Sequence, residues 1–278
     1  MIYNYNYEFI FGGDVLRLNT ERGQLAYTNL AGWIFAVLRM FTKDTFYEVL
    51  LAVLMEEQVV FVCENIHILT YTIYLFTEVL FRPFGYPHPC VYIVFEESFL
   101  DAITPIILGV NRSGKWLQEH YNPEHDSKTY VLLNEEAVIF DNRKDKRPRS
   151  DKLKKIVKDF FKIYEKGLAF FKKKKEEAEY SFNASKEEKE QCLLIVNNLN
   201  YFFEIEFARE VPDSEAIKVV SDRIRTRVNH ETHDEATLIS EEVQREILRN
   251  KKEKDPFMER FLKTQIFLNY FFQKIGFE

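Results

Sequence analysis

The sequence predicts an α/β domain with a parallel sheet, followed by an all-α domain. Three short apolar runs rich in β-branched residues occupy residues 59–63, 90–95 and 106–110. Helical stretches separate them, and such runs are typical of parallel strands that helices cover on both faces. Beyond residue 141 the sequence changes character, and from residue 151 its pattern is helical. We expect a three-layer, Rossmann-like domain over residues 1–143 and a helical domain over residues 144–278, joined across roughly 141–152.

Composition and length indicate a globular protein. Hydrophobic residues make up 46% of the 278 residues and charged residues 29%, which excludes a disordered chain. The three cysteines share no metal-ligand spacing, so a reducing, intracellular compartment is expected. The N-terminus resembles no signal peptide, and the most apolar stretch, 66–81, is too short to span a bilayer. The prediction is therefore a cytoplasmic protein with at most peripheral membrane contact.

The first elements follow from local patterns. Residues 3–18 alternate apolar and polar side chains around Gly12 and Gly13, which predicts a hairpin or a strand that leads into the domain. Residues 28–42 carry apolar side chains three and four apart, so a helix is expected. Asp44 or Thr45 can cap the next helix, whose stripe of apolar residues is buried while Glu56 and Glu57 leave the core.

The central elements alternate between strands and helices. Asn65 is a good cap for a helix over 66–81, and three prolines then begin a loop. Glu96–Ile103 is predicted as a short helix that Thr104-Pro105 stops, and residues 113–121 as another. The remaining strand candidates are Thr129–Leu133 and Ala137–Phe140.

The second half of the sequence is basic at first and then helical. From 141 to 175 there are 15 Lys and Arg against 5 Asp and Glu, a local charge of +10 in a chain of net charge −6. Apolar stripes at helical spacing run through residues 153–164, 193–203 and 257–270. Asp255-Pro256 is a typical helix start.

One segment resembles a phosphate-binding loop. Gly109–Lys115 fits the first seven positions of the P-loop pattern and follows a strand, and Asp141 ends a later strand as a magnesium-binding acid does. The eighth position is Trp116, which has no hydroxyl for the metal. A surface loop after a buried strand is the favoured interpretation, and an NTPase is a distant alternative.

Other catalytic or cofactor patterns are incomplete. The turn Cys63-Glu64-Asn65 has no glycine to admit a pyrophosphate, so no dinucleotide site is predicted. His230 and His233 are one residue short of metalloprotease spacing. We therefore predict no cofactor, no metal site and no covalent chemistry.

The central block resembles a DENN domain. The similarity rests on the helix–turn–strand segment Leu50–Val62, the long helix at 66–81 with Arg82-Pro-Phe84, and the pieces Tyr92–Phe95, Glu97–Asp101 and Thr104–Val110 in the family's order. Pro256–Phe267 resembles the closing helix of the family's helical downstream part.

This resemblance implies a guanine nucleotide exchange factor for a Rab-type small GTPase in membrane trafficking, a regulator and not an enzyme. The alternative is a scaffold of the same fold that binds a GTPase or another trafficking protein without exchange. Family members also carry an N-terminal longin-like lobe, for which residues 1–43 are too few. The alternatives are a fragment whose lobe lies in cis, a lobe supplied in trans by another chain, or a reduced member without exchange activity. The resemblance also implies that any peripheral membrane contact is with vesicle or endosomal membranes. The loops matching the family pattern suggest GTPase contacts at Phe99, Asp101, Thr104, Pro105, Asn111 and Arg112.

The basic stretch ends in four consecutive lysines. Lys172, Lys173, Lys174 and Lys175 could face anionic lipid. A solvated helix face and linker, balanced by the acidic run after residue 175, is the favoured interpretation, and no nucleic-acid partner is expected.

Overall fold

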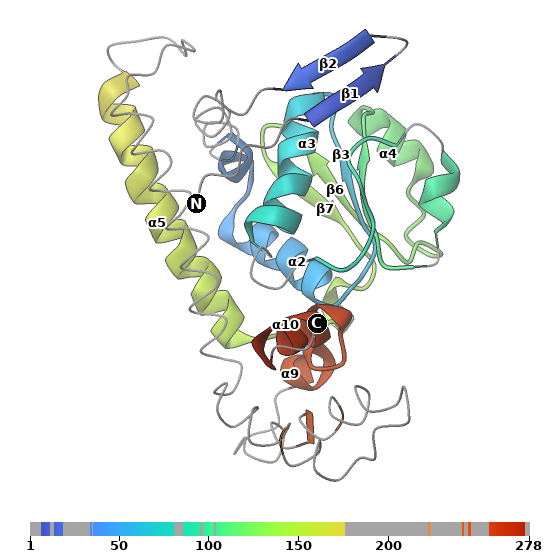
Figure 1. Ribbon diagram of the computed structural model, residues 1–278, viewed down its shortest axis with the longest axis vertical. Helices are drawn as coiled ribbons and strands as arrows, with labels where there is room; N and C mark the ends of the chain where they lie inside the picture. The colour runs from blue at the N-terminus through green and yellow to red at the C-terminus, as the bar shows by residue number, and fades with distance from the viewer. Residues whose placement is uncertain are drawn as a thin grey trace.

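Figure 1 shows the computed structural model of the chain. The residues that it describes are 7–11, 14–18, 34, 36–80, 86–94, 97–102, 104–175, 222, 241, 244–245 and 256–275. Two short strands, β1 (Tyr7–Phe11) and β2 (Asp14–Leu18), pair antiparallel with Phe11 opposite Asp14. This confirms the hairpin predicted around Gly12 and Gly13.

A five-stranded sheet forms the centre of the fold. Its strands lie in the order β4 (Cys90–Val91), β5 (Ile107–Val110), β3 (Val59–Val62), β6 (Thr129–Leu133) and β7 (Ala137–Phe140). The first four are parallel, and β7 returns antiparallel beside β6. The mostly parallel sheet confirms the predicted α/β class, with the correction that the last strand is antiparallel, because a three-residue connection permits only a hairpin.

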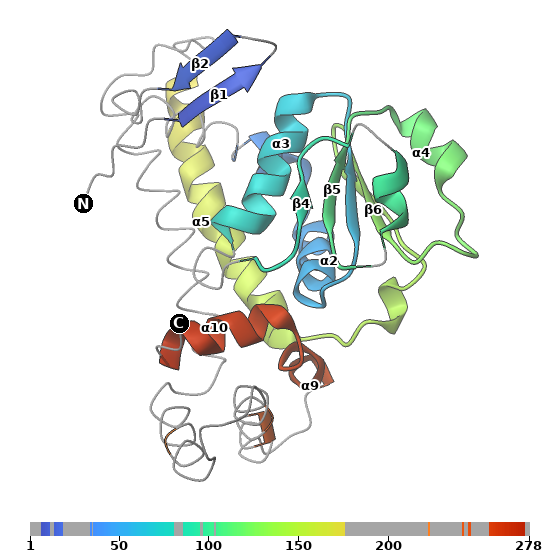
Figure 2. The ribbon, with the colours of Figure 1, turned by 45° about the vertical axis from the view of Figure 1, so that its right-hand side comes forward.

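Helices cover both faces of this sheet (Figure 2). The covering helices are α2 (Lys43–Leu54) and α3 (Ile66–Tyr74) on one face, and the 3₁₀ helix η3 (Glu97–Asp101) and α4 (Gly114–His120) on the other. Side chains of β3 alternate between them: Phe61 packs with the first pair and Val62 with the second. The domain therefore has the predicted three layers.

The strand order explains which face each helix covers. From β3 the chain crosses the sheet in one direction through α3, and from β5 it crosses in the opposite direction through α4. Crossovers between parallel strands are right-handed, so opposite directions require opposite faces. The neighbouring strands β3 and β5 consequently send the chain to different sides of the sheet.

The strand predicted at 90–95 is shorter than expected. Of the described residues 90–94, only Cys90 and Val91 form ladder pairs with β5, while the amide of Val94 donates to the carbonyl of Gly109 at 2.7 Å. Tyr92 and Ile93 therefore bulge out of the ladder. A Cβ atom added at Gly109 would lie 2.1 Å from the carbonyl oxygen of Tyr92, so the bulge requires glycine at this position in the neighbouring strand.

Helix α3 changes its winding before it ends. Residues Leu75–Val79 form a π-helical segment, η2, in which the amide of Leu80 donates to the carbonyl of Leu75 at 3.0 Å. The predicted helix over 66–81 is thus confirmed as far as residue 80. Residue 81 lies outside the described residues.

The described helices of the second half pack on the first. Helix α5 (Asp151–Lys175) places its apolar face against α2, where the rings of Phe160 and Phe46 stack at 5.4 Å. Helices α9 (Pro256–Phe261) and α10 (Gln265–Ile275) contribute to the same core. The helical stripe predicted at 193–203 lies outside the described residues, and the domain boundary at 143/144 stays a prediction.

The closing helix is two helices. The predicted stripe at 257–270 is continuous, but the chain turns between α9 and α10. The hydroxyl of Thr264 donates to the carbonyl of Phe261 at 2.7 Å and accepts from the amide of Phe267 at 3.2 Å. This threonine ends one helix and caps the next, a role that apolar spacing alone does not reveal.

The described helices include none with the length and apolarity that crossing a bilayer would require.

We expect Gly109→Ala to destabilise the fold by about 3 kcal/mol, because the new methyl group would displace backbone atoms of Tyr92. Urea-induced unfolding measures the change. Gly114→Ala is the matched control: its nearest neighbour is the mobile side chain of Leu132 at 3.1 Å, and its free energy of unfolding should change by less than about 1 kcal/mol. Equal losses in the two variants would contradict the assigned role of Gly109.

Candidate functional site

The carboxyl ends of β3 and β5 form the switch point of the sheet. The chain leaves these neighbouring strands toward opposite faces, and α3 and α4 begin there. In doubly wound folds, ligands bind in the crevice at such a point, beside the first turns of the helices. A ligand-binding site of this fold would therefore be expected at this edge.

The crevice at the switch point is bridged by a side chain of the protein itself. The amide nitrogen of Asn111, directly after β5, donates to the carbonyl of Cys63 at 2.9 Å and to that of Glu64 at 2.8 Å. Asn65 accepts from the first amides of α3, those of His67 and Ile68. The groups that would approach a phosphate in a dinucleotide fold are thus bonded within the chain.

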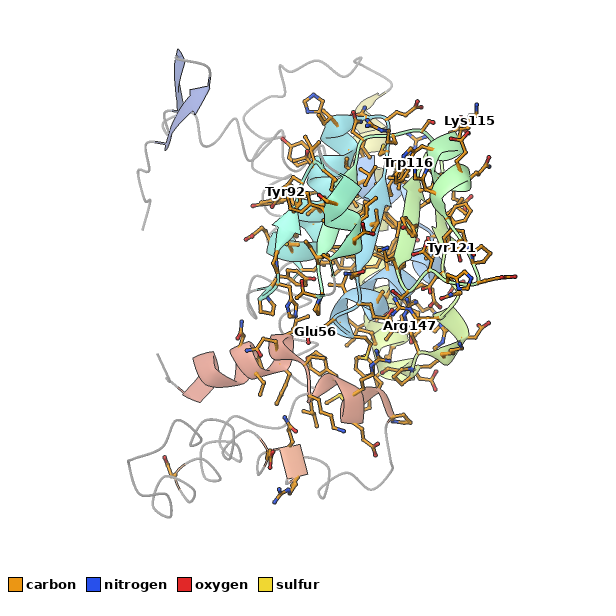
Figure 3. All side chains as sticks on the ribbon, turned by 90° about the vertical axis from the view of Figure 1, so that its right-hand side faces the viewer. Glu56, Tyr92, Lys115, Trp116, Tyr121 and Arg147 are labelled. Carbon is orange, nitrogen blue, oxygen red and sulfur yellow. The ribbon has the colours of Figure 1, made fainter. Side chains whose placement is uncertain are left out.

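The P-loop-like segment has a different geometry from a phosphate-binding loop. Gly109 lies within β5, where it makes room for Tyr92, and Gly114 is the first residue of α4. The side chain of Lys115 is 83% exposed and lies 3.8 Å from Glu119, at the outer end of α4 in Figure 3. Trp116, which replaces the metal-binding hydroxyl, stacks on His120 with 4.3 Å between ring centres. These contacts favour the interpretation of a helix start after a buried strand.

The predicted contact residues fall into two groups. Asn111 and Arg112 lie at the carboxyl edge, where Arg112 donates to the carbonyl of Asn111 at 3.1 Å. The others lie in the connection that leads to the start of β5: Phe99, Asp101, Thr104 and Pro105. Because β5 separates the two groups, they do not form one patch.

The group before β5 is held by a single side chain. Gln58, which precedes β3, donates to the carbonyls of Ala102 and Thr104, the latter at 3.0 Å. This contact fixes the end of η3 while leaving the ring of Phe99 43% exposed. The side chains of Lys172–Lys175, the last residues of α5, lie outside the described residues.

One surface residue was missed by the sequence reasoning. Ile66 begins α3 and is 41% exposed at the carboxyl edge. Its spacing from the buried residues Leu69 and Ile73 predicts burial. The side chain is exposed because it lies in the first turn, beyond the end of the sheet, and the cap at Asn65 is the signal that could have revealed this.

The amino end of the sheet contains a buried group of four charged residues and one threonine. We call it the Arg147 cluster: Glu48, Glu57, Thr129, Asp141 and Arg147. The guanidinium of Arg147 contacts Glu57 at 2.6 Å, Thr129 at 2.6 Å and the carboxylate of Asp141. Its side chain is 1% exposed. Figure 3 shows Arg147 toward α9, at the end of the sheet away from Lys115. Asp141 therefore pairs with Arg147 at the end of the sheet opposite the P-loop-like segment, where it cannot act together with that segment as a magnesium-binding acid.

Glu56 and Glu57 were expected to leave the core, and for Glu57 this is wrong. Glu57 is only 5% exposed, because Arg147, Arg143 and Arg260 surround its carboxylate. Glu56 has a positive φ of 55° and accepts from the amide of Ile266 at 2.8 Å, in the first turn of α10. The two glutamates of this turn thus bind the closing helices.

Burial and charge act in opposite directions on the pKa of Arg147. Burial disfavours the charged guanidinium and alone would lower its pKa, but the hydrogen bond and charge of Glu57, followed by those of Asp141, raise the pKa above its ordinary value. Arg147 therefore stays charged, and the cluster is a buried ion pair network. Among the described residues no group of acids, histidines and cysteines is placed to hold a metal ion.

The fold and this edge define a class: a three-layer α/β protein whose switch point is closed by its own side chain. Residues 29–134 match the family model of the DENN (AEX-3) domain. No curated protein matches the chain. The matched region covers α2 through β6, which includes the four parallel strands of the sheet and both helical layers, and this part of the chain is assigned to the DENN domain family. DENN domains are generally associated with Rab-type GTPases, as regulators and not as classical enzymes.

We expect Arg147→Met to lower the free energy of unfolding by about 3–5 kcal/mol, because the buried carboxylates of Glu57 and Asp141 would both lose their contact with this guanidinium. Arg149→Met is the control. Arg149 also pairs with Glu48, but its side chain is 44% exposed, so a loss below about 1 kcal/mol is expected.

The double variant Arg147→Met/Glu57→Gln separates loss of the ion pair from loss of packing. If the pair matters, this variant will be more stable than the sum of the single losses predicts. Strict additivity in urea unfolding would contradict the assigned pairing.

The thiol of Cys90 provides a pH-dependent test of the packing around β4. Burial, followed by the charge of Glu78, raises the pKa of Cys90 to about 12. An unfolded cysteine titrates near pH 8.5, so alkylation of native Cys90 at that pH should be slower than in urea by on the order of a thousandfold. Mass spectrometry of the Cys90 peptide measures both rates.

The raised pKa of Cys90 also makes the stability of the fold depend on pH. Below about pH 8.5 both states carry the protonated thiol, whereas between about 8.5 and 12 the unfolded chain ionises first, so the contribution of Cys90 is lost as pH rises. Equal alkylation rates in the folded and unfolded protein would contradict this burial.

Proposed function

We propose that this chain is a guanine nucleotide exchange factor for a Rab-type small GTPase, or the central and downstream portion of one, acting in membrane trafficking. The observation that carries the proposal is the DENN match over 29–134, which spans the whole parallel part of the sheet. Such a factor makes and breaks no covalent bond. It binds the GTPase better without GDP, and this coupling free energy speeds GDP release.

Two exposed apolar side chains beside predicted contact residues support a protein-binding role. Ile66 lies at the carboxyl edge with Arg112, and Phe99 lies before β5 with Asp101. An apolar anchor within a polar rim is the usual composition of an interface hot spot. We propose Phe99, Asp101, Thr104 and Pro105 as one contact surface and Asn111 and Arg112 as a second, with a longin-like lobe as an additional partner in cis or in trans.

The rigidity of the switch point supports the same proposal. Asn111 holds the β3–α3 turn through two hydrogen bonds, so the backbone around Glu64 and Ile66 is fixed before any partner arrives. A preformed surface loses little conformational entropy on binding. The nucleotide, in this proposal, is bound by the GTPase.

The experiment is release of a fluorescent GDP analogue from a panel of Rab proteins, with and without a longin-like lobe supplied in trans. We expect at least one member to release GDP about tenfold faster, the equivalent of roughly 1.4 kcal/mol in the barrier. No acceleration for any member, with the lobe present, would refute exchange activity. Binding to nucleotide-free Rab without acceleration would instead support the scaffold alternative.

Matched variants test the contact surface. Phe99→Ala should lower the exchange rate about tenfold, the loss expected for a hot-spot side chain. Val138→Ala is the control, because Val138 is 46% exposed but lies on β7, at the opposite edge of the sheet from β4 and η3. Equal rates for the two variants would exclude Phe99 from the interface without affecting the test of exchange itself.

A further inference from the structure

Helix α5 has one face in the core and an opposite, outer face on which lysines predominate. Its buried face consists of Leu153, Ile156, Val157, Phe160, Phe161 and Tyr164. At 100° per residue, Lys155, Lys158 and Lys162 lie on the outer side of the helix, and all three are exposed. Three acids share that side: Asp151, Asp159 and Glu165. The seven-residue span from the first to the last of these lysines is about 10 Å long. Figure 1 shows α5 as one uninterrupted helix along the side of the molecule.

The charge of this helix is opposite to that of the chain. Residues 151–175 contain ten lysines and three acids, a charge of +7, whereas the whole chain has −6, which leaves −13 for the remainder. Within the part of the chain that the structure describes, Lys155 and Lys158 make no ion pair. In the described residues 151–165, five lysines against three acids give a charge of +2, and the side chains of Lys155 and Lys158 are exposed to solvent.

The pKa of Asp159, an acid on the same helix, responds to the lysines around it. Asp159 accepts a hydrogen bond from Lys162 at 2.5 Å. This bond, followed by the charges of Lys162, Lys155 and Lys158, lowers the pKa of Asp159, although slight burial opposes the shift. Lys155, Lys158 and Lys162 therefore create a positive potential around Asp159 that favours anionic groups.

We propose that the lysine face of α5 docks the protein on an anionic lipid bilayer. The apolar face of α5 is packed against α2, so the helix cannot insert its apolar residues and binding is electrostatic. A flat charged surface can meet the whole row of lysines at once. The proposal is independent of exchange activity.

The exposed residues of the helix favour lipid over nucleic acid. Every aromatic residue between 151 and 165 is buried, so none is available for stacking on bases. The exposed cations are lysines, which act as point charges and lack the planar fork with which arginine recognises bases. Binding to an anionic membrane surface requires only such point charges.

Vesicle co-sedimentation of the full chain tests the proposal. We expect binding to vesicles of phosphatidylcholine with phosphatidylserine, no binding to phosphatidylcholine alone, and release at high salt, because salt screens the attraction. The variant Lys155→Gln/Lys158→Gln should bind the anionic vesicles about 25-fold more weakly, since each lysine near such a surface contributes about fivefold.

The control variant is Lys115→Gln/Lys263→Gln, which changes the net charge equally but on α4 and on the turn between α9 and α10. It should bind as the natural sequence does. Thermal melting checks that both variants fold. Equal weakening in the two variants, binding that is insensitive to phosphatidylserine, or tighter binding to RNA in a parallel titration would each overturn the proposal.

Discussion

The carboxylate of Glu57 is the point at which the separate parts of this fold meet. It lies in the turn between α2 and β3, and it contacts Arg147 from the segment after the sheet and Arg260 from α9. Placing a carboxylate in the protein interior is costly unless cations and hydrogen bonds surround it. The sequence meets this requirement with arginines from segments far apart in the chain. The sheet, the start of α5 and the closing helices are thereby held in one arrangement.

In this arrangement, residues on the two sides of the predicted domain boundary are in contact. The segment 141–152 was expected to join two domains, yet Asp141 and Arg147 lie within the buried cluster and Phe160 stacks on Phe46 of α2. An independent domain buries its own apolar face, whereas the described part of α5 buries its apolar face against the first domain. For these residues, the stability of the α/β domain and that of the downstream helices are coupled.

The elements that were predicted correctly from the sequence are those that depend only on residues close together in the chain. The strand 59–62 and the cap at Asn65 need only neighbouring residues, and both are found. The Arg147 cluster was missed because Glu57 and Arg147 are 90 positions apart, and no periodic pattern relates them. The bulge at Tyr92 was missed because its β-branched neighbours favour a strand, whereas the backbone contact with Gly109 decides the outcome. The contact residues for a partner remain predictions, since surface composition does not identify a binding site without its partner.

The P-loop-like segment shows how the same residues can serve packing in one protein and phosphate binding in another. Gly109 is needed for the approach of a carbonyl from β4, and Asn111 uses its amide to close the switch point. A factor that acts by binding alone must hold its contact surface in place, because ordering that surface on binding would reduce the coupling free energy. Asn111 at one end of the sheet and Arg147 at the other provide this order. Asn111, whose amide bridges the two loops at the switch point, is therefore also the residue that fixes the surface proposed to contact a protein.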